Sequence, residues 1–129
     1  VYQHGTVYDR NAVPSNLASQ EGQVFGTAYG TDGFAAVLPD YVGLGTSDAP
    51  YHPYLHVATQ ASAAVDLLRA ARTLAQQQGA ALDGGNLYVT GYSQGGHAAL
   101  GLHRVLERDH AAEFPVRAAV PMSGAYDLT

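Results

Sequence analysis

The chain has 129 residues, which is enough for one domain with its own core. Hydrophobic residues make up 47% and charged residues 13%, a composition that is typical of a folded protein and excludes disorder or a coiled coil. All six strong bases are arginines and the net charge is −5, so the chain has no basic cluster to bind nucleic acid or an anionic membrane surface. Because the chain has no cysteine, it can form neither disulfides nor thiolate metal sites.

The first elements are a strand tail, a helix and a buried strand. Residues 1–3 are expected to end a strand, and a helix is expected over residues 19–29, stopped by Gly30. Residues 33–39 are a continuous apolar run, which is typical of a strand buried on both faces of a parallel sheet. We expect Asp40, after that run, to fix the 43–45 loop by accepting backbone hydrogen bonds.

The later elements have clearer patterns. Residues 57–78 form the strongest helix, ended by Gly79, with an apolar stripe made of Val57, Ala61, Ala64, Val65, Leu68, Ala71 and Ala75; Gln60 is expected off that stripe. Residues 86–90 predict a strand and residues 117–122 another. Between them, a helix is expected over residues 94–108, with inward residues Ala99, Leu102 and Leu106.

Strands and helices therefore alternate along the chain. Such alternation predicts an α/β fold with an open parallel sheet of about four strands and helices on both faces. The predicted strand order is second, first, third, fourth. Since no interdomain linker is visible, residues 1–129 are expected to form a single domain, and the lack of a long apolar run predicts no integral membrane segment.

The most informative motif is Gly91-Tyr92-Ser93-Gln94-Gly95, which lies between the predicted strand 86–90 and the following helix. A G-x-S-x-G sequence in this context is the pattern of a nucleophile elbow, in which a sharp turn lifts a serine hydroxyl to a helix N-terminus. The two glycines give the clearance that such a turn needs. The motif predicts Ser93 as a nucleophile for acyl transfer.

An acyl-transfer site also needs donors for the oxyanion. The elbow itself supplies the backbone N–H of Gln94. The second donor must come from another loop at the same sheet edge, and Gly5 or Thr6, directly after the first strand, is the candidate. His4, Tyr92, His52 and Tyr54 are candidates for lining a pocket.

The chain offers no convincing general base. In the chain order typical of this elbow, the histidine follows the nucleophile, yet His97, His103 and His110 all lie on the helix that leaves the elbow or at its end. Asp127, after the last strand, is a weak candidate for the acid. The spacing of the histidines predicts no metal site, and the sequence suggests no cofactor.

The ordered motifs together resemble an α/β-hydrolase of the secretory-lipase-like group. They are His4-Gly5-Thr6, Pro14-Ser15, the Pro39 to Ser47 run, His52-Pro53-Tyr54, the Asp66 to Ala71 run and Gly91 to His97. The resemblance implies an esterase or lipase acting on an acyl ester, a Ser93 nucleophile, an oxyanion hole at Gly5-Thr6 and Gln94, and secretion or a periplasmic location.

The resemblance covers only the middle of that fold. The catalytic histidine and its acid are therefore expected outside this chain, and the missing flanking strands are expected from the rest of the polypeptide or from another chain, because bare apolar sheet edges are avoided. Two alternatives remain open at this stage. One is a serine peptidase or thioesterase on the same fold, and the other is a noncatalytic binding module.

Overall fold

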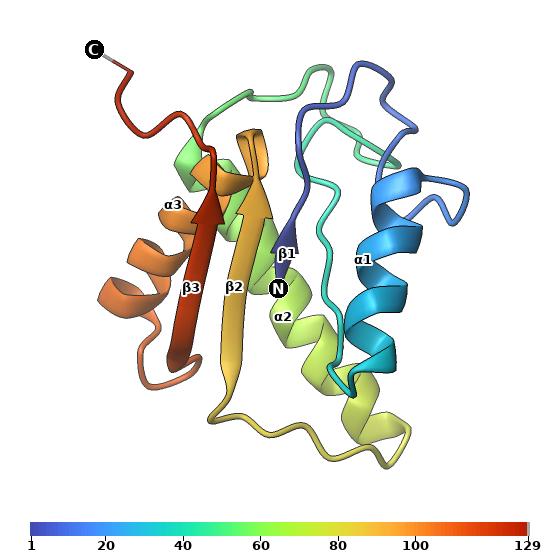
Figure 1. Cartoon of the computed structure of the whole chain (residues 1–129), viewed down its shortest axis with the longest axis vertical. Coiled ribbons are helices and arrows are strands. Elements are labelled where there is room, and N and C mark those ends of the chain that lie inside the picture. Colours follow the sequence, from blue (N-terminus) through green and yellow to red (C-terminus); the bar gives the residue numbers. More distant parts are fainter. Residues whose placement is uncertain (129) are drawn as a thin grey trace.

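The computed structural model describes residues 1–128 as a parallel sheet packed with helices (Figure 1). Its strands are β1 (Tyr2–Gln3), β2 (Leu87–Tyr92) and β3 (Val116–Met122), in the spatial order β1-β2-β3. Its helices are α1 (Gln20–Thr31), α2 (Val57–Gln77) and α3 (Gln94–Asp109). All strand pairs are parallel, as the sequence predicts, and the strands end at one edge of the sheet.

Helices cover both faces of the sheet. Val89 of β2 is buried against the residues of α2 and α3 that form the main core, whereas the neighbouring Thr90 points to the other face. Tyr2 of β1 is in register with Thr90 and stacks on Phe25 of α1, with 3.9 Å between the ring centroids. Thus α1 lies on the face opposite to α2 and α3.

The expected strand over residues 33–39 is not formed. This segment runs beside β1 (Figure 1), but its link to that strand is a hydrogen bond from the Tyr2 N–H to the Val37 oxygen, 2.9 Å long. A ladder needs several such bonds, and β1 offers only two residues. The sheet therefore has three strands among the described residues, and the predicted neighbours of the elbow strand are otherwise correct.

Glycines in the left-handed conformation end two helices. Gly79, with a φ of 68°, follows α2 as predicted, and its N–H donates to the Gln76 oxygen. The helix α1 is formed where the sequence predicts it, but its predicted end at Gly30 was wrong, because the helix continues through Gly30 to Thr31. The residue that terminates it is Gly33, with a φ of 83°, after which the Phe34 N–H bonds back to the Tyr29 oxygen.

The core lies between the sheet and the pair α2 and α3. The predicted inward residues of α3 are fully buried, and so is most of the α2 stripe, namely Ala61, Ala64, Val65 and Leu68. Gln60 was expected off that stripe but is 1% exposed, and its side-chain amide has no hydrogen-bond partner among residues 1–128. None of the helices in those residues has the length and apolarity that crossing a bilayer requires.

Candidate active site

The turn from β2 into α3 has the geometry of a nucleophile elbow. Ser93 has φ 57° and ψ −120°, a combination that a residue with a side chain rarely adopts. Glycines surround it because the chain is crowded: a Cβ on Gly91 would overlap the Gly95 oxygen, and a Cβ on Gly96 would overlap the Met122 oxygen. Ser93 itself is neither buried nor fully exposed. The strained corner thus holds it at the carboxyl edge of the sheet.

Ser93 is anchored through its main chain. Its N–H donates to the main-chain oxygen of Met122 at 3.0 Å, and its main-chain oxygen accepts hydrogen bonds from the N–H groups of Gly96 and His97. These bonds tie the elbow to β3 and to the first turn of α3. The Gln94 N–H lies in the same first turn and takes part in none of these bonds.

The loop after β1 is held in place by side chains on three sides. The Gly5 N–H donates to the Glu21 Oε2 of α1 at 3.0 Å, and the Tyr41 hydroxyl donates to the His4 oxygen at 3.0 Å. The His4 Nδ1 lies 2.7 Å from the Gly5 oxygen. The Gly5 N–H is therefore engaged. Of the two candidates for the second oxyanion donor, Gly5 and Thr6, only the Thr6 N–H takes part in none of these bonds.

His4 supports the loop from inside. It is 1% exposed and stacks on Tyr41 with 4.2 Å between ring centroids, so the structure places it under the loop, not on an open pocket wall. The Nε2 of His4 lies 3.1 Å from the main-chain oxygen of Asp40. Burial lowers the pKa of His4, while the hydrogen bonds to the Asp40 and Gly5 oxygens act in the opposite direction.

The other candidate pocket residues gather near Ser93. The Nε2 of His52 lies 2.6 Å from the Gln94 side-chain nitrogen and its Nδ1 lies 2.9 Å from the Val42 oxygen, an arrangement that fits a neutral ring with its proton on Nδ1. The Tyr54 hydroxyl is 2.8 Å from the Thr6 Oγ1, which links two loops beside the site. Tyr92, next to the serine, is 53% exposed.

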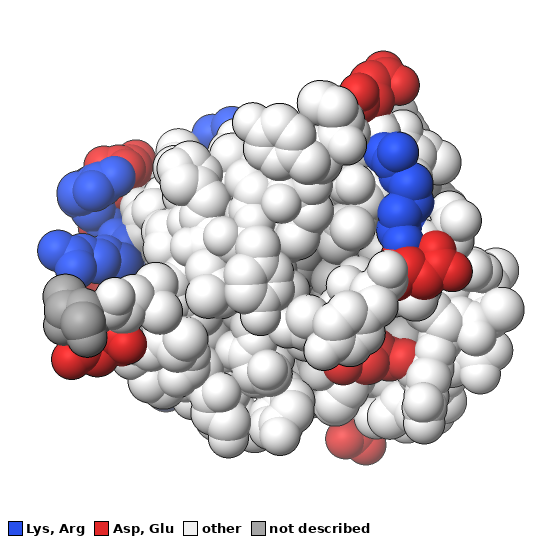
Figure 2. All heavy atoms as spheres, turned by 90° about the horizontal axis from the view of Figure 1, so that it is seen from above, with Lys and Arg blue, Asp and Glu red and all other residues white. Residues whose placement is uncertain are grey.

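Figure 2 looks down on the face that contains this site, from the side to which the strand ends point in Figure 1. Arginine, aspartate and glutamate side chains gather toward the margins of that face, and its middle is formed by uncharged side chains. The surroundings of the elbow therefore suit an uncharged group better than a strongly charged one.

None of the six histidines, all of which lie among the described residues, is hydrogen-bonded to Ser93. The two ring nitrogens of His97 lie 2.7 Å from the Ala125 oxygen and 3.0 Å from the Leu55 oxygen. His103 and His110 face Glu107 and Glu113, and the His56 Nδ1 lies near the Thr59 hydroxyl. With His4 and His52 held as described above, each histidine has another role.

The two aspartates considered from the sequence differ in position. Asp127 is exposed after β3, on the segment that leaves the sheet (Figure 1). Asp40 does not fix the 43–45 loop as expected: it accepts hydrogen bonds from the Ser15 N–H, at 2.9 Å, and from the Ser15 hydroxyl. The Gly45 N–H of that loop instead donates to the Arg10 main-chain oxygen at 2.8 Å, a contact between distant residues that the local sequence does not indicate. No three His, Asp or Glu side chains in the described part of the chain could together hold a metal ion.

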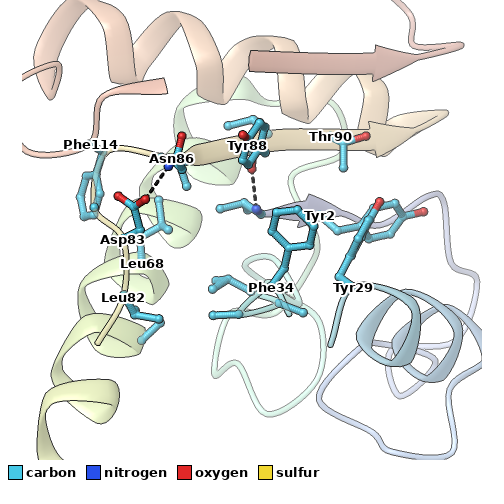
Figure 3. Close-up of a pocket in the computed structure, with 18 of the residues that line it drawn as sticks. Tyr2, Tyr29, Phe34, Leu68, Leu82, Asp83, Asn86, Tyr88, Thr90 and Phe114 are labelled. Atoms are coloured by element: carbon cyan, nitrogen blue, oxygen red, sulfur yellow. Dashed lines mark hydrogen bonds between the residues drawn. The ribbon is translucent and has the colours of Figure 1, made fainter. Parts of the chain in front are cut away.

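Figure 3 presents a cavity of about 800 Å³ that lies along the sheet. Its walls include Tyr2, Tyr29, Phe34, Tyr88 and Phe114. None of the predicted site residues lines it. The size of this cavity alone therefore does not make it the candidate active site. The residues that the sequence predicts for the site lie at and around the elbow.

Two residues that reasoning from the sequence did not find are Glu21 and Tyr41. Glu21 is in the first turn of α1, where an acidic residue already has a local explanation in the helix dipole. Tyr41 has a φ of 70°, and its phenol is buried. Both act on the loop after β1 across more than 15 positions of sequence, so no local pattern indicated them.

No protein-family model and no curated protein matches the chain. Solved structures do. A candidate hydrolase from Legionella pneumophila is 37% identical with a TM-score of 0.90, over 98% of this chain and 33% of its own. The rice cell wall degrading esterase LipA from Xanthomonas oryzae is 35% identical with a TM-score of 0.70, over 95% of this chain and 33% of its own, and its ligand-bound form gives 36% and 0.71.

The chain thus spans about a third of the length of these structures. Their agreement with its three-stranded parallel sheet and flanking helices identifies the fold as a partial α/β-hydrolase core, as the sequence predicts. The structural neighbours are a candidate hydrolase and an esterase, whereas the narrower secretory-lipase-like resemblance stays a prediction.

Proposed function

We propose that the protein is a serine hydrolase that cleaves carboxylic esters through an acyl-enzyme on Ser93. The observation that carries the proposal is the conformation of Ser93, with φ 57° and ψ −120°, at the N-terminus of α3. Strained conformations of this kind cluster at active sites and ligand-binding segments. The esterase among the structural neighbours supports the ester as the substrate class.

In the proposed reaction, the Ser93 oxygen attacks the ester carbonyl while a histidine takes the serine proton. The carbonyl oxygen becomes an oxyanion, which the N–H groups of Gln94 and Thr6 stabilise. When the ester bond breaks, the alcohol leaves with the proton from the histidine. Water then attacks the acyl-enzyme, the acid product forms and the serine proton is restored.

The histidine and its acid are proposed to lie outside these 129 residues, because none of the histidines here is hydrogen-bonded to Ser93. Asp127 stays a candidate for the acid. In the same proposal, residues 1–129 form a single incomplete domain, and the rest of the polypeptide or another chain completes it. The uncharged middle of the site face (Figure 2) favours an uncharged acyl ester, such as a lipid ester, as the substrate.

The test compares the full-length protein with its Ser93→Ala variant on p-nitrophenyl esters, an acyl thioester and a peptide amide. We expect the ester to be the best substrate and the variant to lose at least about 1,000-fold in kcat. Preference for the thioester or the amide would instead indicate a thioesterase or a peptidase. Absence of any turnover that depends on Ser93 would favour a binding module.

A further inference from the structure

We propose that Glu21 is a positioning residue for the oxyanion hole, an inference that rests on the function proposed above. Its carboxylate holds the Gly5 N–H. This contact restrains the φ and ψ angles of Gly5, which connect that N–H to the peptide unit that contains the next main-chain donor, the Thr6 N–H. Glu21 would not touch the substrate. It would act through the loop that does.

The contact between Glu21 and Gly5 is close and specific. The Glu21 Oε2 accepts from the Gly5 N–H at 3.0 Å, and a Cβ added to Gly5 would lie 3.1 Å from the Glu21 Oε1. The carboxylate is therefore packed directly on a residue that has no side chain. A hydrogen bond to an ionised acceptor is about twice as strong as a neutral one, so this bond restrains the glycine well.

The carboxylate is itself fixed by its surroundings. The Tyr2 hydroxyl donates to the Glu21 Oε2 at 3.4 Å, and burial, followed by the charge of Glu21, raises the pKa of Tyr2 so that the phenol keeps its proton. Tyr2 belongs to β1 and stacks on Phe25 of α1, which fixes the helix against the strand. The N-terminal position of Glu21 in α1 also favours a negative charge.

Other contacts restrain the same loop and leave one donor for a substrate. The Tyr41 hydroxyl holds the His4 oxygen, and the His4 ring holds the Gly5 oxygen. Glu21 fixes the other end of the same residue, the Gly5 N–H. Without it, Gly5 would be held through its oxygen alone, and its φ and ψ angles would be less restrained. Because a displacement of 1 Å in a positioned group can cost about 100-fold in rate, this contact should matter for catalysis.

The experiment uses the full-length protein and three variants, Glu21→Ala, Glu21→Gln and Glu21→Asp. Glutamine keeps an acceptor at the same distance, whereas aspartate keeps the charge but is one methylene too short. The Tyr2→Phe variant tests the support of the carboxylate, because it removes a contact to Glu21 and leaves the Gly5 bond. The measurements are kcat and KM for a p-nitrophenyl ester, inhibition by a trifluoromethyl ketone, and the melting temperature.

We expect kcat to fall about 10- to 100-fold in the alanine and aspartate variants, with KM changed by less than about threefold. The trifluoromethyl ketone, whose adduct with the serine has an oxyanion, should bind more weakly by the same factor as kcat falls. The glutamine variant should recover most of kcat, to within about fivefold. The Tyr2→Phe variant, which loses a long contact of 3.4 Å and keeps the Gly5 bond, should lose less kcat than the alanine variant.

An unchanged kcat and unchanged ketone inhibition in the folded alanine or aspartate variant would overturn the inference, even if the melting temperature fell. If the alanine variant does not fold, the aspartate variant decides in the same way. Failure of the proposed function gives a different result, because the Ser93→Ala variant would then keep the esterase activity of the wild type.

Discussion

Gly95 of α3 lies directly against the main-chain oxygen of Gln3 in β1, with no room between them for a side-chain carbon. Gln3 immediately precedes the loop that contains Thr6, and Gly95 comes two residues after Ser93. This contact therefore brings together the predicted nucleophile and the predicted second oxyanion donor, which are 87 positions apart. The elbow glycine has a tertiary role in addition to its role in the turn.

Replacing Gly95 by alanine should destabilise the protein strongly. A Cβ there would overlap the Gln3 oxygen, and backbone on both sides leaves nothing that can move aside cheaply. We expect a loss of at least about 2 kcal/mol in the free energy of unfolding, measured in urea. Gly26→Ala is the matched control, because nothing lies within 4 Å of that position in α1. It should gain about 0.5–1 kcal/mol. Equal stability of the two variants would contradict this interpretation.

The Thr6 side chain should matter less than its N–H. Thr6→Val keeps the main-chain donor and removes the contact of the hydroxyl with Tyr54, which is exposed. We expect kcat to change by less than about threefold, since only the side chain is lost, and a double-mutant cycle with Tyr54→Phe to give a coupling of about 0.5 kcal/mol in stability. A 100-fold loss of kcat in Thr6→Val would instead place the hydroxyl in the chemistry.

His4 should make stability depend on pH below about 6.5. Burial lowers its pKa from the ordinary value of 6.5, so between the two pKa values the unfolded chain binds a proton that the folded protein does not. The contribution of His4 is fully present above pH 6.5 and decreases as the pH falls below it, by up to about 1.4 kcal/mol per pH unit. His4→Phe should remove this dependence. The measurement is urea unfolding from pH 4.5 to 8, and parallel curves for the two proteins would refute the assignment.

The parts of the fold that the sequence predicted correctly depend on local patterns. The stripe of α2, the inward residues of α3 and the strand-turn-helix around Ser93 each need only neighbouring residues, and all three are formed. Gly79 ends α2 for the same local reason. An apolar or glycine pattern within one element was therefore enough to predict these features.

The parts that were wrong or missed depend on contacts between distant residues. The apolar run 33–39 has strand composition, but forming a strand needs a partner ladder, and β1 provides only two residues. Gln60 is buried although it is polar. Glu21 of α1 accepts a hydrogen bond from Gly5 in the loop after β1. Neither feature is indicated by a local pattern in the sequence. In the candidate site, the sequence identified the candidate oxyanion donors but could not show whether Gly5 or Thr6 supplies the second one.

The most direct test of the central claim is covalent labelling of the full-length protein with a fluorophosphonate, followed by mass spectrometry of its peptides. A nucleophilic serine at the elbow should carry the label on Ser93, with one label per molecule and parallel loss of esterase activity. Mutation to Ser93→Ala should abolish the labelling. A label on any other residue, or no label on a protein that still hydrolyses esters, would contradict the assignment of Ser93 as the nucleophile.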